Sequence, residues 1–195
     1  MRNDVIVRPL TPSRWDDLVE LFGDNGAYGG CWCMFFRVAR KEFDAGTRNR
    51  GKENRAALKQ LVDRRSTPGL LAYIDGRPVG WCSVAPRSEF GRIERSPIVK
   101  PIDDEPGVWS IVCFYMHRGH RGEGVGTALL QAAVDHAARK GARIVEAYPV
   151  DPHGKLSNAD AYHGLVWMFE KAGFTEVARR SDRRPIMRYV VAATA

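Results

Sequence analysis

The feature that most constrains the fold of this 195-residue chain is the stretch 108–130, VWSIVCFYMHRGHRGEGVGTALL. Residues 108–116 are almost continuously apolar and rich in β-branched and aromatic side chains, which predicts a strand covered on both faces. From Val125 onward, apolar residues recur at helical spacing and indicate a helix with one buried face. A glycine-rich turn, RGEGVG at 121–126, joins the two. The chain therefore has a strand–turn–helix unit past its middle.

This turn predicts an anion-binding site. Glycines without Cβ let successive backbone N–H groups point at a ligand, and the start of a helix adds partial positive charge. A Walker-type loop would need Gly-Lys-Ser/Thr, and no lysine follows these glycines, so nucleotide hydrolysis is not expected. A dinucleotide fold would place the turn near the first strand, with an acidic residue about 20 positions on. Only Glu146 meets part of that pattern.

The strand, the Arg-x-x-Gly-x-Gly turn and the amphipathic helix resemble the acetyl-CoA pyrophosphate loop of the GNAT superfamily of N-acetyltransferases. A second motif agrees: MFEKAGF at 168–174 resembles the helix end and Gly-Phe turn that close the cofactor cleft of that family. A strand is predicted between the two motifs at 143–149. The resemblance covers about 108–189, and the first hundred residues match mainly in the order of their elements.

The resemblance implies an α/β (α+β) fold of GNAT type, with a mixed, twisted central β-sheet and helices on both faces. It also implies a single domain, 1–195, in which 1–107 form the acceptor side and 108–191 the acetyl-CoA-binding core. The sequence patterns predict strands at 5–10, 69–74, 78–84, 108–116, 143–149, 176–180 and 185–191. They predict helices at 12–22, 52–65, 125–140 and 161–172, and irregular segments at 24–36, 85–107 and 151–160.

Composition decides the expected environment and partners. No apolar run is long enough for a signal peptide or a membrane span, so the protein is expected to be cytoplasmic, without a membrane partner. Its four cysteines are then expected to be reduced thiols. The net charge of +7 suits a polyanionic ligand such as coenzyme A. Nucleic acid is not an expected partner, because no zinc-finger, helix-turn-helix or RNP pattern accompanies the charge. The oligomeric state stays open, a homodimer included.

The resemblance implies transfer of an acetyl group from acetyl-CoA to an amine acceptor, a small molecule or a peptide, by direct attack in a ternary complex. A backbone N–H of the central strand, among Phe114, Tyr115 and Met116, would hold the oxyanion. Phe169 would also lie at the cofactor. The pyrophosphate would bind the turn formed by Arg121, Gly122, Glu123, Gly124, Val125, Gly126 and Thr127. The alternative is a CoA-binding sensor or interaction module with little or no catalysis.

A catalytic base is needed because a lysine-like amine, with a pKa of about 10.4, arrives protonated. Glu146 is the leading candidate, since a carboxylate inside an apolar strand is costly unless it is partnered or used. The alternative for Glu146 is a structural ion pair with an arginine. Glu89, with Glu94, is the second choice. Many relatives carry a tyrosine that returns a proton to the leaving thiolate. Phe169 stands at that position, so water or another side chain must supply the proton.

The acceptor is expected to bind under the 24–36 and 85–107 segments. Tyr28 and Trp32 would give this pocket apolar walls, which suit an acceptor with an apolar body. Cys31 and Cys33 form a Cys-x-Cys pair, but no second pair lies at zinc-ligand spacing. No metal is therefore expected, and the two thiols are interpreted as buried groups beside the acceptor.

Overall fold

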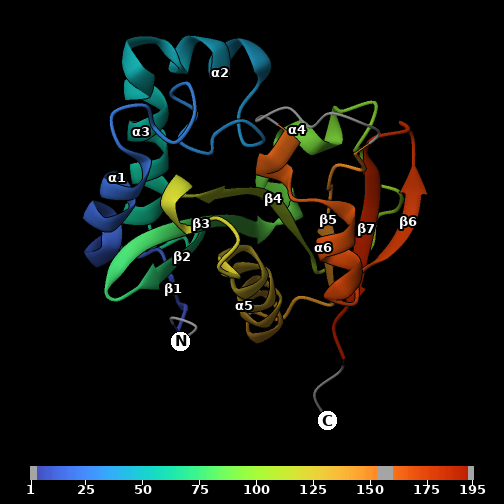
Figure 1. The fold of residues 1–195 in the computed structure, drawn as a ribbon. Coiled ribbons are helices and arrows are strands. Elements are labelled where there is room, and N and C mark those ends of the chain that lie inside the picture. The colour runs from blue at the N-terminus through green and yellow to red at the C-terminus, as the bar shows by residue number, and fades with distance from the viewer. Residues whose placement is uncertain (1–3, 153–159, 193–195) are drawn as a thin grey trace.

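The computed structural model describes residues 4–152 and 160–192. These residues form a seven-stranded sheet in the order β1-β2-β3-β4-β5-β7-β6 (Figure 1). The β4–β5 pair is parallel and all other neighbouring strands are antiparallel. This confirms the predicted mixed sheet of GNAT type. The strands are β1 (Ile6–Pro9), β2 (Gly69–Ile74), β3 (Arg77–Pro86), β4 (Val108–Met116), β5 (Ile144–Ala147), β6 (Thr175–Arg179) and β7 (Pro185–Val190).

Helices cover both faces of the sheet (Figure 1). The α-helices are α1 (Trp15–Phe22), α2 (Arg40–Gly46), α3 (Arg48–Asp63), α4 (Gly91–Glu94), α5 (Val125–Arg139) and α6 (Val166–Lys171). Four 3-10 turns accompany them: η1 (Pro12–Arg14), η2 (Arg87–Glu89), η3 (Arg118–His120) and η4 (Asp160–His163). Within the described ranges, no helix is both long and apolar enough to cross a membrane.

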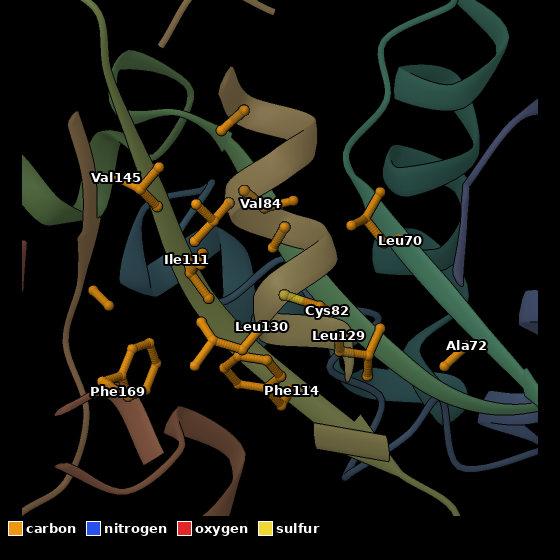
Figure 2. Packing of buried hydrophobic residues seen from close by; sticks show 14 of the residues in the cluster. Leu70, Ala72, Cys82, Val84, Ile111, Phe114, Leu129, Leu130, Val145 and Phe169 are labelled. Atoms are coloured by element: carbon orange, nitrogen blue, oxygen red, sulfur yellow. The ribbon is translucent and has the colours of Figure 1, made fainter. Parts of the chain in front are cut away.

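Alternating side chains of the strands divide the core between the two faces. On β2, Leu70 and Ala72 pack toward α5, whereas Leu71 packs toward α1 and α3. Figure 2 shows Leu129 and Leu130 of α5 among the strand residues of the first cluster. Burying each leucine fully contributes about 1.5–3 kcal/mol. The long amphipathic helix after the glycine turn is thus fixed firmly against the centre of the sheet.

β4 contains one extra residue, which changes the direction of the side chains after it. Ser83 of β3 pairs with Cys113, but the next residue, Val84, pairs with Ile111, so Val112 has no partner in the ladder. Such a β-bulge interrupts the alternation of side chains. Ile111 and Phe114 both pack on the α5 face, as Figure 2 shows. Val112 and Cys113 consecutively face the opposite side.

The ladder between β4 and β5 ends early. Its last pair is Ile111 with Ala147, although β4 continues to Met116. Beyond β5 the chain makes an isolated bridge between Val150 and Leu165 instead. On its β5 side, the outer half of β4 therefore has no strand partner in the described structure. The sheet is open beside its central strand.

Some predicted elements differ in their bounds. The short helix α2 was not expected. The range of α3 starts at Arg48, but residues 49–51 adopt left-handed φ angles, so the regular helix begins after Gly51, close to the predicted start at residue 52. The helix predicted at 161–172 is interrupted: Gly164 has a φ of 74°, and α6 starts only at Val166. The 151–160 loop lies largely outside the described residues.

Two glycines hold the 24–36 segment against α3. A Cβ on Gly51 would lie 2.4 Å from the Gly30 carbonyl oxygen, and a Cβ on Gly30 would lie 2.8 Å from the Gly51 nitrogen. The buried Asn54 amide donates a hydrogen bond to the same Gly30 oxygen, at 2.9 Å. This close approach between two backbones positions the segment that carries Tyr28 and the Cys-x-Cys pair.

We expect Gly51→Ala to destabilise the protein more than its left-handed φ of 76° alone explains. Gly76→Ala is the matched control, because Gly76 has a similar φ of 77° but no atom within 4 Å of an added Cβ. The backbone contact should make Gly51→Ala lower the free energy of unfolding by about 1–3 kcal/mol more than the control. Urea denaturation measures both. Equal losses of unfolding free energy in the two variants would show that the Gly30–Gly51 contact can accommodate a Cβ.

Candidate active site

The glycine turn leads directly into α5. Gly122 and Gly124 have left-handed φ values of 86° and 85°, and an added Cβ on either would meet no atom within 4 Å. The first helical hydrogen bond runs from the Ala128 N–H to the Gly124 oxygen, so the preceding N–H groups have no acceptor within the helix. Arg118 and Arg121 flank the turn. Open space, free N–H groups and positive charge fit the diphosphate of coenzyme A.

The third glycine of the turn has a different role. A Cβ on Gly126 would lie 3.3 Å from the sulfur of Met116 and 3.5 Å from that of Met168. Gly126 therefore permits close packing of α5 against β4 and α6, and its Cα faces the interior. The neighbouring Val125 side chain is also buried. Any contact of these two residues with the donor would come from their backbone.

A cleft runs along the open side of β4. Its donor end is a cavity of about 630 Å³ beside Arg118 and Arg121, and its other end is a cavity of about 310 Å³. The two cavities share the tyrosines 28, 115 and 162 as walls. The ring of Tyr162 lies 5.3 Å from that of Tyr28 and stacks at 6.2 Å on that of Tyr115. These three rings therefore lie where the two cavities of the cleft meet.

The second cavity, which we call the acceptor pocket, has apolar walls. None of its lining residues within the described structure is Asp, Glu, Lys or Arg. The lining consists of Ala27, Tyr28, Gly29, Cys31, Cys33, Phe35, Phe36, Phe43, Thr47, Val112, Cys113, Tyr115, Tyr162 and His163. Tyr28, which the sequence analysis assigned to the acceptor side, lines this pocket, and 56% of its surface is exposed.

Three thiols form part of the pocket wall. The sulfur of Cys33 lies 3.8 Å from that of Cys113 and accepts a hydrogen bond from the Trp81 indole at 2.9 Å. The hydrogen bond with Cys113 and burial raise the pKa of Cys33, and the hydrogen bond with Cys33 and burial raise that of Cys31. Both groups are therefore neutral, polarizable wall atoms. No set of three His, Cys, Asp or Glu residues is arranged for a metal ion within 4–152 and 160–192.

His163 is a pocket residue that the sequence did not indicate. Its Nδ1 lies 3.2 Å from the carbonyl oxygen of Val112, at the bulge of β4. Because a carbonyl oxygen only accepts, Nδ1 must carry the hydrogen of this contact. The ring lies 5.8 Å from that of Phe36. The only sequence signal was a titratable residue next to an aromatic one, without diagnostic spacing.

Glu146 lies at the centre of a buried ion cluster. It is 0% exposed, accepts a hydrogen bond from the Tyr148 hydroxyl at 2.6 Å, and bonds the Arg188 guanidinium at 2.7 Å. Arg87 is 3.5 Å away. Arg188 also binds Asp103 and lowers the pKa of that carboxyl to about 2. Glu146 lines neither cavity of the cleft, so its surroundings favour the structural ion pair over the catalytic base.

Three other candidates also lie away from the cleft. Glu89 forms a 2.7 Å ion pair with the buried side chain of Arg37. Trp32 is only 3% exposed and stacks on Trp15 in the α1–α3 core. Left-handed φ angles at Trp32 and Cys33 accompany this placement, which loop composition could not indicate. Phe169 is fully buried, 6.0 Å from Phe114.

An open mixed sheet, a glycine-rich turn at a helix start and a pocket without acids in its described lining are compatible with the site of a CoA-dependent acyltransferase. The sequence model of the acetyltransferase (GNAT) family matches residues 32–174. The chain belongs to this family, as its two motifs predicted.

A curated relative agrees with this assignment. An uncharacterized N-acetyltransferase of Methanocaldococcus jannaschii is 25% identical over 170 residues, which are 87% of this chain and 60% of that protein. The chain thus spans less than two thirds of that relative.

Solved structures share the fold. PaiA N-acetyltransferase of Thermoplasma acidophilum, solved with coenzyme A, has a TM-score of 0.54 at 16% identity, covering 96% of this chain and 99% of its own. The yncA protein of Salmonella typhimurium, solved with its cofactor acetyl-CoA, has a TM-score of 0.57 at 16% identity, covering 98% and 96%.

We expect Glu146→Gln to act on stability more than on catalysis. Removing one partner of a buried ion pair costs about 3–5 kcal/mol, because the other charge stays buried, and denaturant titration should show a loss of that order. Turnover per folded molecule should stay close to wild type. Asp103→Asn is the matched control: it removes a carboxylate from the same Arg188, but one that is 42% exposed, and should cost less. A stable Glu146→Gln protein with turnover lowered about 10²-fold would restore Glu146 as the base.

Proposed function

We propose that this chain is an acetyl-CoA-dependent N-acetyltransferase, which moves an acetyl group to an amine by direct attack in a ternary complex. The observation that carries the proposal is the cleft along β4. Its donor end is lined by Arg118 and by Arg121, the first residue of the glycine turn, and its other end is a pocket without an acid in its described lining. Both ends meet at the open edge of one strand. Family membership supports the reaction class.

The donor end would hold the cofactor by its charged part. Backbone N–H groups of the predicted turn 121–127 would bind the diphosphate, and the side chains of Arg118 and Arg121 would add charge attraction. Acetyl-CoA, when bound, supplies the acetyl group as a thioester. A free N–H of β4, among Phe114, Tyr115 and Met116, would stabilise the oxyanion.

The acceptor pocket supports an amine with an apolar body. Tyr28 and the phenylalanine side chains offer contact area, while no carboxylate lies in the described lining to hold an ammonium ion. An ammonium ion that leaves water without such a partner becomes a stronger acid. The pocket itself would therefore help to bring the amine into its reactive, neutral form.

We assign the general base to His163 and the general acid to Tyr162, adjacent residues of η4. The Val112 carbonyl accepts from Nδ1 of His163, so Nε2 is the nitrogen that would take the proton of the amine. Burial and the neighbouring Tyr115 raise the pKa of Tyr162. Its hydroxyl therefore stays protonated and could donate its proton to the leaving thiolate. Tyr162 would then supply the proton that Phe169 cannot, from a position where the two cavities meet.

For the donor end, we expect Gly124→Val to weaken coenzyme A binding at least about 10-fold, because it fills the open side of the turn and strains an N–H donor there. Gly141→Val is the matched control: it has nearly the same φ, 84°, equally open surroundings, and lies at the other end of α5. Calorimetry of both folded variants measures the effect. Equal affinities would place the diphosphate elsewhere.

For the chemical step, we expect His163→Gln to lower turnover by about 10²–10⁴, the usual loss for a general base. Coenzyme A affinity should be unchanged. Part of the rate should return at high pH, where the amine arrives neutral. A thiol-release assay across an amine panel measures this. Full turnover in the variant would exclude His163 as the base, and coenzyme A binding without transfer to any amine would favour the sensor alternative.

A further inference from the structure

A third cavity, of about 350 Å³, adjoins the acceptor pocket. Phe35 and Phe36 line both spaces and form their common wall. Four arginines from three parts of the chain line this third cavity: Arg40 of α2, Arg92 and Arg95 at α4, and Arg184 before β7. No Asp or Glu is among its lining residues within the described ranges. We call it the arginine cavity.

Two of these cations are held in place. Arg92 donates a hydrogen bond to the Phe35 carbonyl at 3.0 Å, and its guanidinium carbon lies 3.9 Å from the centre of the Phe35 ring. Arg184 donates to the Tyr148 carbonyl at 2.9 Å. The Phe35 carbonyl is a neutral acceptor, so it orients the Arg92 guanidinium without cancelling its charge. A fixed cation loses little conformational entropy when it binds an anion.

The remaining charge is poorly compensated. Arg40 pairs with Asp44 on the surface, but an exposed pair of this kind is weak and screened by salt. The Arg95 guanidinium makes no hydrogen bond or ion pair with any residue in the described part of the chain. Burial, together with repulsion from Arg40 and Arg95, lowers the pKa of Arg92. Like charges gathered around a cavity attract an anion into it.

We propose that the arginine cavity binds an oxyanion, a carboxylate or a phosphate, at the end of the acceptor that is remote from its amine. This rests on the proposed function. Guanidinium groups bind both oxyanions through paired N–H donors. A series of contacts links His163 of the acceptor pocket to Arg92 of the arginine cavity. His163 lies 5.8 Å from Phe36, Phe36 lies 4.9 Å from Phe35, and Phe35 lies 3.9 Å from the Arg92 guanidinium.

The substrate class that follows is an amine with an apolar body and a terminal oxyanion. The apolar body would occupy the acceptor pocket, and the oxyanion would lie beyond Phe35 and Phe36, in the arginine cavity. Polycationic amines do not fit, because a second ammonium group would meet the four arginines. The positive charge of the chain thus acts at both ends of the cleft, on the diphosphate of the donor and on the acceptor.

The test uses 4-(aminoalkyl)benzoates of increasing alkyl length, each compared with its neutral benzamide and with its phenylphosphonate. We expect the anionic member to exceed the benzamide about 10-fold or more in kcat/KM at the best length, mainly through KM. Arg95→Gln should remove most of this preference with little change in kcat, and Arg95→Lys should restore part of it. The control Arg77→Gln removes the same charge from the exposed first residue of β3 and should keep the preference.

Direct binding separates failure of this inference from failure of the proposed function. Calorimetry without acetyl-CoA should show Arg95-dependent binding of the benzoate or phosphonate over the benzamide. Such binding without acetyl transfer to any amine would keep the oxyanion site and reject the enzyme. Transfer with equal kcat/KM for anionic and neutral acceptors at every length, or a preference that survives both Arg95→Gln and Arg92→Gln, would overturn the oxyanion site.

Discussion

One extra residue in the central strand organises the site. Because Val112 is bulged, Val112 and Cys113 both face the acceptor pocket, while Ile111 and Phe114 face α5. Without the bulge, strict alternation would direct Cys113 into the core and Phe114 into the pocket. The bulge also lies one residue beyond the last β4–β5 pair. It therefore coincides with the opening of the sheet, and the carbonyl of the bulged residue orients His163.

Among the described residues, charged side chains lie at the two ends of the cleft and not in the pocket between them. Arginines flank the glycine turn at the donor end and line the cavity beyond Phe35 and Phe36, but the pocket between them has neither acids nor cations in its described lining. In such a low-dielectric space, each remaining dipole acts strongly, and an ammonium ion without a partner is destabilised. Under the proposed function, the protein would bind charge at the two ends of its substrates and keep the reacting centre neutral.

The sequence predicted those parts that depend on local patterns. The change from continuous apolar residues to helical spacing at Val125, with glycines between, located β4, the turn and α5. The features that it missed depend on single residues or on tertiary contacts. A continuously apolar strand hides a one-residue bulge, since every position reads as buried. Left-handed φ angles turn Trp32 into the core, and Gly164 separates η4 from α6, which brings His163 to the pocket instead of a helix surface. Glu146 was located as a costly buried carboxylate, but its arginine partners come from distant segments.

The position of Glu146 follows from the same opening of the sheet. Glu146 pairs with Ser110 on β4, where the two strands are still joined, four residues before Phe114. At about 3.3 Å per residue, this is about 13 Å along the strand, farther than a carboxylate side chain reaches. Its cluster with Arg188 and Asp103 instead ties β5 to β7 and to the segment before β4. The buried charges thus lie where the strands are paired, and the sheet opens only beyond Ile111.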